Sequence, residues 1–308
     1  MIGFATVSLP GQDRYGVLVT DLAPEAIDDP QVRRALHELW IDKGLVVFRG
    51  VDGGIDTQLR LSHIYGEPEV HPMMAGTDIR TEHRALAPVE FDREDGNIYE
   101  VAGELRGGYL PWHFDGAYVD RINHGGILRP EVLPNCGGDT GFIDQIAAYE
   151  LLPDRLKERI EGLSVVYSYQ PDFTQARFGV RVDRLVRMST LFRKGMEHPS
   201  VQTRAIHPLV YRQAETGKKV LHVSPWFADG IEGMETPEGD ALLADVIDHV
   251  IQPELMYFHK WQVGDMVLWD NWRMLHCATG VPPEETRIMR RTTIVGDYGL
   301  GRREEKRA

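Results

Sequence analysis

A histidine and an aspartate stand two positions apart where residues 112–115 read Trp-His-Phe-Asp. Along an extended segment, residues two apart point to the same side, so His113 and Asp115 can present an imidazole and a carboxylate to one metal ion. A hydrogen-bonded surface pair gives the same pattern, and it is the more common origin of an isolated His-x-Asp sequence. The pair is therefore a candidate metal site that needs a third ligand.

His276 is the candidate third ligand. It follows the apolar run Met266–Trp269 and a polar turn, so we expect it beside a buried strand, where an imidazole needs a partner. Two histidines and one carboxylate form the facial triad of non-haem Fe(II) oxygenases, which leaves three metal positions open. A zinc hydrolase can use the same donors with one water, so this alternative stays open.

The segment Arg287–Val295 is predicted to be a strand close to His276. Its period of two places Arg287 and Arg291 on one face, together with Met289 and Thr293. Two arginines on one face of a central strand are costly unless an anion meets them, and the planar guanidinium binds a carboxylate through two hydrogen bonds. Cross-strand salt bridges on a solvated face explain one arginine more readily than both.

The surrounding sequence predicts an α+β fold, in which a mainly antiparallel β core has helices packed outside it. No glycine-rich phosphate loop follows a strand, which disfavours dinucleotide and P-loop folds. Helical spacing and stop signals predict helices over Pro24–Lys43, Thr57–Tyr65, Asp144–Ile160 with a break at Pro153, and Pro237–Ile251. Strands are predicted over Leu45–Phe48, Lys219–Val223, Met266–Trp269 and Arg287–Val295.

Composition narrows the function classes. The 308 residues carry a formal net charge of −13, which argues against nonspecific binding to nucleic acid or to an anionic membrane surface. No apolar run approaches the length of a membrane span, and no secretory signal is visible. Two cysteines cannot build a disulfide framework, so we expect a cytoplasmic protein. Its expected partner is a small molecule, and a homo-oligomer is possible.

Five features in fixed order carry a resemblance to a known family. They are His113 with Asp115, the turn Gly137–Thr140, the distal His276, and then Arg287 and Arg291, eleven and fifteen residues after His276. With this pattern the chain resembles the taurine dioxygenase and aryloxyalkanoate dioxygenase (TauD/TfdA) family of Fe(II)/2-oxoglutarate oxygenases over about residues 10–297.

The resemblance implies a double-stranded β-helix (jelly roll) and a role for each matching residue. His113, Asp115 and His276 would hold Fe(II), with 2-oxoglutarate and O2 as cosubstrates. Thr140 and Arg287 would bind the distal carboxylate of 2-oxoglutarate. The reaction would be hydroxylation of an unactivated C–H bond with release of succinate and CO2, and desaturation or further oxidation stays open. A non-catalytic jelly-roll binding module is the remaining alternative.

The substrate is predicted to be small and to carry a carboxylate or a similar anion. The resemblance places Arg291 close to the cosubstrate and to anionic substrates, and it matches His71 to a substrate-loop histidine. Tyr109 and Met74 stand where taurine dioxygenases have asparagine and tyrosine, which disfavours taurine. Tyr109 is therefore expected to line a more apolar substrate pocket.

The chain is predicted to form one oxygenase domain over residues 1–298, followed by a flexible, charged tail over residues 299–308. A lid-like insert over about residues 170–200 contains several basic residues, which would attract an anionic substrate or form a subunit contact. Those residues are Arg177, Arg181, Arg184, Arg187, Arg193 and Lys194.

Overall fold

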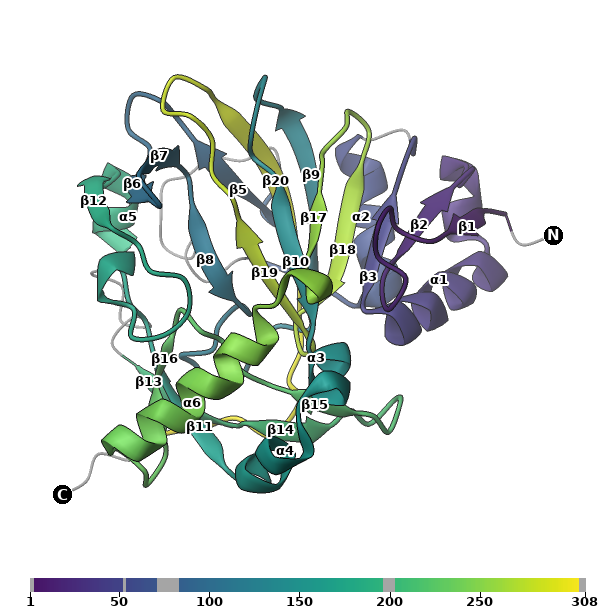
Figure 1. The fold of residues 1–308 in the computed structure, drawn as a ribbon. Coiled ribbons are helices and arrows are strands. Elements are labelled where there is room, and N and C mark those ends of the chain that lie inside the picture. Colours follow the sequence, from purple (N-terminus) through teal and green to yellow (C-terminus); the bar gives the residue numbers. More distant parts are fainter. Residues whose placement is uncertain (1–2, 52–53, 71–82, 196–202, 305–308) are drawn as a thin grey trace.

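Two β-sheets form the centre of the protein (Figure 1), as seen in a computed structural model that describes residues 3–51, 54–70, 83–195 and 203–304. Except for the parallel pair β2–β3, neighbouring strands are antiparallel. The larger sheet has the order β1 (Ala5–Val7), β2 (Val17–Thr20), β3 (Leu45–Phe48), β18 (Met266–Asp270), β9 (Gly125–Val132), β20 (Arg287–Ile294) and β4 (Pro68–Glu69), with β5 (Leu86–Phe91) also paired to β20. The smaller sheet has the order β17 (Tyr257–His259), β10 (Thr140–Asp144), β19 (Met274–Ala278) and β8 (Leu110–His113).

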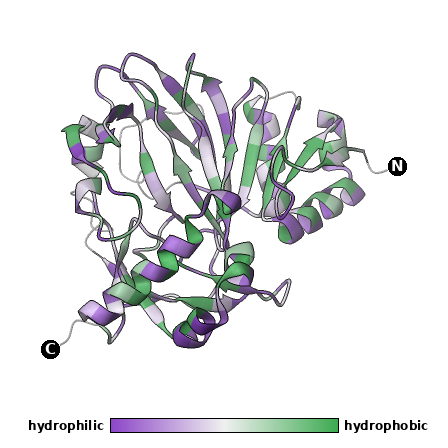
Figure 2. Cartoon of the chain, viewed as in Figure 1, coloured by the Kyte–Doolittle hydropathy of each residue, from purple (hydrophilic) through white to green (hydrophobic). Residues whose placement is uncertain are grey.

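Hydrophobic pattern explains which strands lie deepest. Strands β3 and β18 consist of buried residues throughout, which is expected where both faces of a sheet are covered. The helices α1 (Pro30–Lys43) and α2 (Ile55–Tyr65) pack beside the larger sheet, and each turns buried residues toward it. Figure 2 shows green strands in the core and mixed green and purple helices around them. The mainly β core with helices packed outside is as predicted.

Smaller elements surround this core. A third sheet has the order β16 (Ala228–Ile231), β11 (Ser164–Ser168), β13 (Arg204–Pro208) and β21 (Arg302–Arg303). The other strands are β12 (Arg184–Arg187), β6 (Ile98–Val101) and β7 (Glu104–Gly107) in one sheet, and the pair β14 (Val210–Arg212) and β15 (Lys219–Leu221). The other helices are α3 (Gln145–Leu151), α4 (Asp154–Ile160), α5 (Thr190–Gly195) and α6 (Pro237–Val250), with 3-10 turns η1 (Pro24–Asp28), η3 (Phe173–Gln175) and η5 (Pro253–Leu255).

The predicted helix over residues 24–43 is in fact two elements, η1 and α1. Pro30 disfavours helical backbone at Asp29, which instead caps α1 by accepting a hydrogen bond from the Gln31 N–H at 2.7 Å. Gly44 ends α1 in the left-handed conformation (φ 71°), as predicted. The break expected at Pro153 separates α3 from α4.

Residues 302–304, which belong to the predicted tail, have partners in the folded protein. Strand β21 pairs with β13, and Arg303 forms an ion pair with Asp120 at 3.2 Å. Glu304 forms an ion pair with Arg204 at 2.7 Å, so Arg303 and Glu304 both have charged partners. A charge run looks solvated in the sequence because its partners are distant along the chain. Within the described residues, no helix combines the length and apolar character needed to cross a membrane.

Candidate active site

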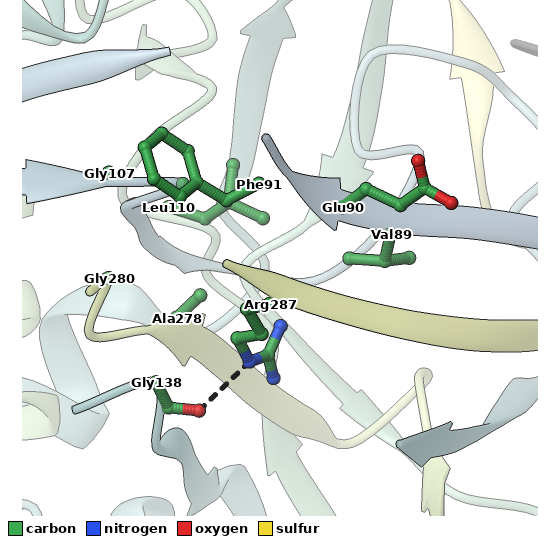
Figure 3. Close-up of a pocket in the computed structure, with 10 residues that line it drawn as sticks. Val89, Glu90, Phe91, Gly107, Leu110, Gly138, Ala278, Gly280 and Arg287 are labelled. Carbon is green, nitrogen blue, oxygen red and sulfur yellow. Dashed lines mark hydrogen bonds between the residues drawn. The ribbon is translucent and has the colours of Figure 1, made fainter. Parts of the chain in front are cut away.

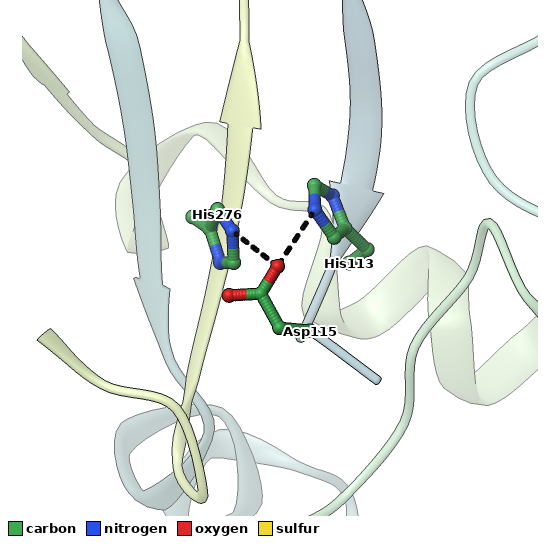
Figure 4. A group of neighbouring side chains, drawn as sticks. All are labelled: His113, Asp115 and His276. Atoms are coloured by element: carbon green, nitrogen blue, oxygen red, sulfur yellow. Dashed lines mark ion pairs between the residues drawn. The ribbon is translucent and has the colours of Figure 1, made fainter. Parts of the chain in front are cut away.

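The structure brings the three predicted metal ligands together where strand β8 ends beside strand β19. His113 ends β8 and lies directly opposite His276 of β19 in the sheet register. The Oδ1 atom of Asp115, just beyond β8, lies 3.7 Å from Nε2 of His113 and 3.6 Å from Nε2 of His276. Figure 4 shows the carboxylate between the two imidazole rings. One ligand atom from each residue lies within 4.8 Å of the others, so a single ion can reach all three.

The protonation states of these groups suit a metal ion. Nδ1 of His113 lies 2.7 Å from the Pro111 carbonyl oxygen, and donation there leaves Nε2 with a free lone pair. Burial lowers the pKa of His276 to about 4, so that imidazole is neutral near pH 7. Burial alone raises the pKa of Asp115, but Arg291 and His276 outweigh it and hold the pKa well below its usual range. Two imidazoles and a carboxylate are the donor set of an Fe(II) facial triad.

Arg291 reaches this site from β20 in the facing sheet. Its Nη2 donates to Oδ2 of Asp115 at 2.6 Å, and its guanidinium lies 5.0 Å from the centre of the Trp269 ring. The other oxygen of this carboxylate, Oδ1, faces the imidazoles of His113 and His276. The anion expected to meet an inward arginine is, for Arg291, supplied by Asp115 of the chain itself. Sequence spacing could not show this contact between distant segments.

Arg287 lies on the same face of β20, and its hydrogen-bond partners are neutral groups of the chain. Its Nε donates to the Gly138 carbonyl at 3.0 Å and its Nη2 to Oγ1 of Thr140 at 3.2 Å. Burial lowers its pKa to about 10, which still leaves it protonated at neutral pH. Trp261 also donates to Thr140 Oγ1, at 3.0 Å, so the threonine hydroxyl is free to donate its own proton. A buried guanidinium and a hydroxyl donor together suit a carboxylate.

A small pocket opens beside Arg287 (Figure 3). The close-up shows Arg287 with its hydrogen bond to Gly138, below the strand that carries Val89 and Glu90. The other residues that line the pocket are Phe91, Gly107, Gly108, Leu110, Ala278 and Gly280. Most of these neighbours are apolar or glycine. Glu90 also lines the pocket, and the nearby Asp139 carboxylate opposes the burial that lowers the pKa of Arg287.

Aromatic side chains form a wall on the other side of His113. The rings of Trp226 and Phe227 lie 4.9 and 5.7 Å from the His113 ring, centre to centre. The ring of Tyr118 packs on Tyr169 and Phe227 at 5.0 and 5.2 Å. Burial raises the pKa of Tyr118 to about 12, and the nearby Asp115 carboxylate adds to the rise. Nothing in the spacing of these four residues distinguishes them from ordinary core aromatics, so the sequence did not reveal the wall.

A second carboxylate lies near Arg291. Glu69 of β4 is opposite Thr293 of β20 in the sheet register, and Thr293 shares the inner face of β20 with Arg291. Burial raises the pKa of the half-buried Glu69 carboxyl, and the Arg291 charge opposes that rise. The sequence drew attention to His71, two residues on, and missed Glu69. His71 and Met74 themselves lie outside the described residues.

Tyr109 does not join the residues at the metal site. A bulge between β8 and β19 makes Leu110 the partner of Ala278, although His113 is the partner of His276. Leu110 and Ala278 therefore line the Arg287 pocket together, and Tyr109 lies near Cys277, which adds to the burial that raises its pKa. Strict alternation from His113 would have placed Tyr109 inward. Its assignment to the substrate pocket stays a prediction, which this placement does not favour.

The basic insert makes several contacts with the body of the protein. Arg184 pairs with Glu100 at 2.7 Å, and Arg177 pairs with Asp240 at 2.5 Å. Arg187 donates to the carbonyl of Arg93 at 2.8 Å. Arg181 and Arg193 are exposed, and the side chain of Lys194 lies outside the described residues. Near the aromatic wall, Phe192 of α5 lies 6.3 Å from the Tyr169 ring.

Comparison with known proteins places this site in a family. The sequence profile described as "Taurine catabolism dioxygenase TauD, TfdA family" matches residues 11–293. An (S)-phenoxypropionate/alpha-ketoglutarate-dioxygenase of Sphingobium herbicidovorans is 31% identical over 283 residues, which cover 92% of each chain. An alpha-ketoglutarate-dependent 2,4-dichlorophenoxyacetate dioxygenase of Burkholderia sp. (strain RASC) is 29% identical over 286 residues, 90% of each chain.

Solved structures confirm the jelly-roll fold. A taurine dioxygenase from Burkholderia xenovorans superposes with a TM-score of 0.73 at 24% identity, over 99% of this chain and 96% of the other. AAD-2 in complex with Mn(II) and N-oxalylglycine gives a TM-score of 0.71 at 24% identity, over 95% and 97% of the two chains. The relatives support an oxygenase rather than a zinc hydrolase or a binding module. The chain belongs to the TauD/TfdA family and is an Fe(II)/2-oxoglutarate-dependent dioxygenase that uses O2.

Proposed function

We propose that His113, Asp115 and His276 hold the Fe(II) of this dioxygenase, and that Arg287 and Thr140 bind the distal carboxylate of 2-oxoglutarate. The observation that carries this assignment is the meeting of two imidazoles and one carboxylate, whose ligand atoms lie within 4.8 Å of one another. Arg287, on the same face of β20 as Arg291, supplies a buried cation with neutral partners for the keto acid. Four residues of strand separate the two arginines by about 13 Å between their Cα atoms, which leaves room for a keto acid between their side chains.

Each residue of the chain has a separable task in this assignment. Bound iron would supply the activation of O2. Arg291 keeps Asp115 ionised and turns its Oδ1 toward the imidazoles, while Arg287 orients the cosubstrate from its far end. The aromatic wall of Tyr118, Tyr169, Trp226 and Phe227 keeps bulk water from the reacting bond. In the net reaction one 2-oxoglutarate and one O2 are consumed, succinate and CO2 leave, and the second oxygen atom enters the substrate.

We propose a small substrate with an aliphatic C–H bond beside a carboxylate or similar anion, and not taurine. Relatives are named for phenoxypropionate, 2,4-dichlorophenoxyacetate and sulfate esters, all of which carry an anionic group. Arg291 has further N–H groups beyond the one given to Asp115, and the exposed Arg181 and Arg193 add positive charge in the basic insert. We further propose that the basic insert forms the rim of the substrate entrance.

We also propose a cytoplasmic location, because both cysteines are free thiols, which suits a reducing compartment.

Substrate-dependent succinate formation tests this proposal. The Fe(II)-loaded enzyme is offered a library of carboxylates, sulfonates, sulfate esters and amino acids, and each active acid is compared with its methyl ester. We expect the ester to lose at least tenfold in kcat/KM, or about 1.4 kcal/mol of transition-state stabilisation. A neutral best substrate, or taurine turnover as fast as that of any carboxylate, would contradict the proposed substrate class.

A further inference from the structure

We infer that Asn271 is a positioning residue, which holds the main chain of Asp115 so that its carboxylate faces the metal. The inference rests on the proposed role of Asp115 as a ligand. Strand β8 ends at His113, so Asp115 lies outside the sheet and has no strand neighbour to pair with its peptide groups. The Asn271 side chain takes that place. Its Oδ1 accepts from the Asp115 N–H at 2.8 Å, and its Nδ2 donates to the Asp115 carbonyl at 3.1 Å.

The Asn271 side chain is itself held rigidly. Asn271 is fully buried, and its Nδ2 also donates to the Asn123 carbonyl at 3.1 Å. Its backbone N–H donates to the His124 carbonyl at 2.8 Å. Both ends of the amide are therefore satisfied, and rotation about its side-chain bonds would break several hydrogen bonds at once.

Its place in the fold connects two ligands of the triad. Asn271 lies in the turn between β18 and β19, and β19 carries His276. A single buried amide therefore links the segment that carries Asp115 to the strand that carries His276. Displacement of this turn would alter the distance between Asp115 Oδ1 and His276 Nε2, which is 3.6 Å in the folded protein.

A neighbouring contact provides a matched control. The Phe114 N–H, one peptide before that of Asp115, donates to Oγ of Ser224 at 3.2 Å, and Ser224 is also fully buried. Removal of the Ser224 hydroxyl thus costs the same ligand segment a buried hydrogen bond without touching Asp115. A purely structural role for Asn271 predicts similar effects from the two changes, whereas positioning of Asp115 predicts different effects on metal affinity.

The test measures binding of Mn(II) alone to the purified full-length protein by isothermal titration calorimetry. For Asn271→Ala we expect the Mn(II) dissociation constant to rise 10- to 100-fold, the range typical of groups that orient metal ligands. For Ser224→Ala we expect the Mn(II) dissociation constant to rise less than threefold. This should hold even if the thermal midpoint of Ser224→Ala falls as far as that of Asn271→Ala. Turnover by Asn271→Ala should recover when Fe(II) is raised to saturation. Asn271→Ser, which disturbs packing less, replaces Asn271→Ala if that variant does not fold.

Two results would overturn the inference: an Asn271→Ala dissociation constant within twofold of wild type, or an equal loss of affinity in Ser224→Ala. His276→Ala, measured in parallel, separates this failure from failure of the ligand assignment. If His276→Ala binds Mn(II) as tightly as wild type, the proposed metal site is wrong. If His276→Ala loses the metal and Asn271→Ala keeps it, the metal site stands and the positioning role is wrong.

Discussion

At the scale of single residues, Arg287 and Arg291 differ in what meets their charge. Arg291 pairs with Asp115 at 2.6 Å, so its charge is matched inside the chain. Arg287 is equally buried, but its partners are the Gly138 carbonyl and the Thr140 hydroxyl. Burial lowers the pKa of Arg287 and thus disfavours its charged form, so an anion that pairs with it recovers stabilisation. This difference supports our proposal that 2-oxoglutarate binds at Arg287.

Arg287→Ala should raise the KM for 2-oxoglutarate far more than the KM for the primary substrate. A charge-assisted, two-point contact in a secluded site contributes about 2–4 kcal/mol, or roughly 30- to 1000-fold in affinity. Steady-state kinetics with each cosubstrate varied in turn measures the effect, and Arg287→Lys should recover part of it. An unchanged KM for 2-oxoglutarate would move the anchor to another residue.

At the scale of elements, strands β9 and β20 set the position of Arg291. Gly126 of β9 is opposite Thr293 of β20, and a Cβ atom at Gly126 would lie 3.2 Å from Nε of Arg291 and 2.8 Å from the Thr292 carbonyl oxygen. The missing side chain leaves room for the Arg291 guanidinium, which lies over the Trp269 ring. A glycine in the interior of a strand here marks a close approach of a functional side chain.

Gly126→Ala should therefore impair both stability and metal binding. The added methyl must displace the Arg291 side chain or the β20 backbone, which we expect to lower the free energy of unfolding by about 1–3 kcal/mol. Loss of the Arg291 contact should also weaken Mn(II) binding through Asp115. Gly54→Ala is the control, because a Cβ there meets nothing within 4 Å and the backbone is not in the left-handed region. Equal urea unfolding and Mn(II) titration curves for the two variants would contradict this account.

Local patterns predicted much of the fold and the grouping of the three candidate metal ligands. The alternation along β20 and the His113–Asp115 spacing depend only on near neighbours, so the sequence shows them directly. The bulge at Leu110 was not predictable, because it depends on how β8 pairs with β19 across a long separation. The same reason hid the contact between Arg291 and Asp115, which only the packing of the two sheets brings together.

At the scale of the whole molecule, buried titratable groups link stability to pH. Burial lowers the pKa of His207 and His276 to about 4 and that of His124 to about 3. In the unfolded chain these imidazoles take up a proton near pH 6.5. Their contribution to stability is therefore complete above pH 6.5 and is lost as the pH falls toward 4. Asp270 acts in the opposite direction, because burial raises its pKa to about 7.

We expect the metal-free protein to lose unfolding free energy between pH 6.5 and 4, by up to about 1.4 kcal/mol per pH unit for each buried histidine. His207 is the best one to test, because it is not one of the proposed metal ligands and it donates from Nε2 to the Val119 carbonyl at 2.9 Å. His207→Gln should be less stable at pH 7 but should show a shallower decline with acid. Urea unfolding at several pH values measures both slopes, and parallel curves would show that His207 does not contribute.

The most direct test of the central claim is the amount of succinate formed from 2-oxoglutarate by wild type and by His276→Ala, with Fe(II), O2 and a substrate found by the library screen. The wild type should form succinate in a reaction that needs all three, and His276→Ala should form almost none while it keeps the wild-type circular dichroism spectrum. Near wild-type succinate formation by the folded His276→Ala variant would contradict the assignment of His113, Asp115 and His276 as the iron site.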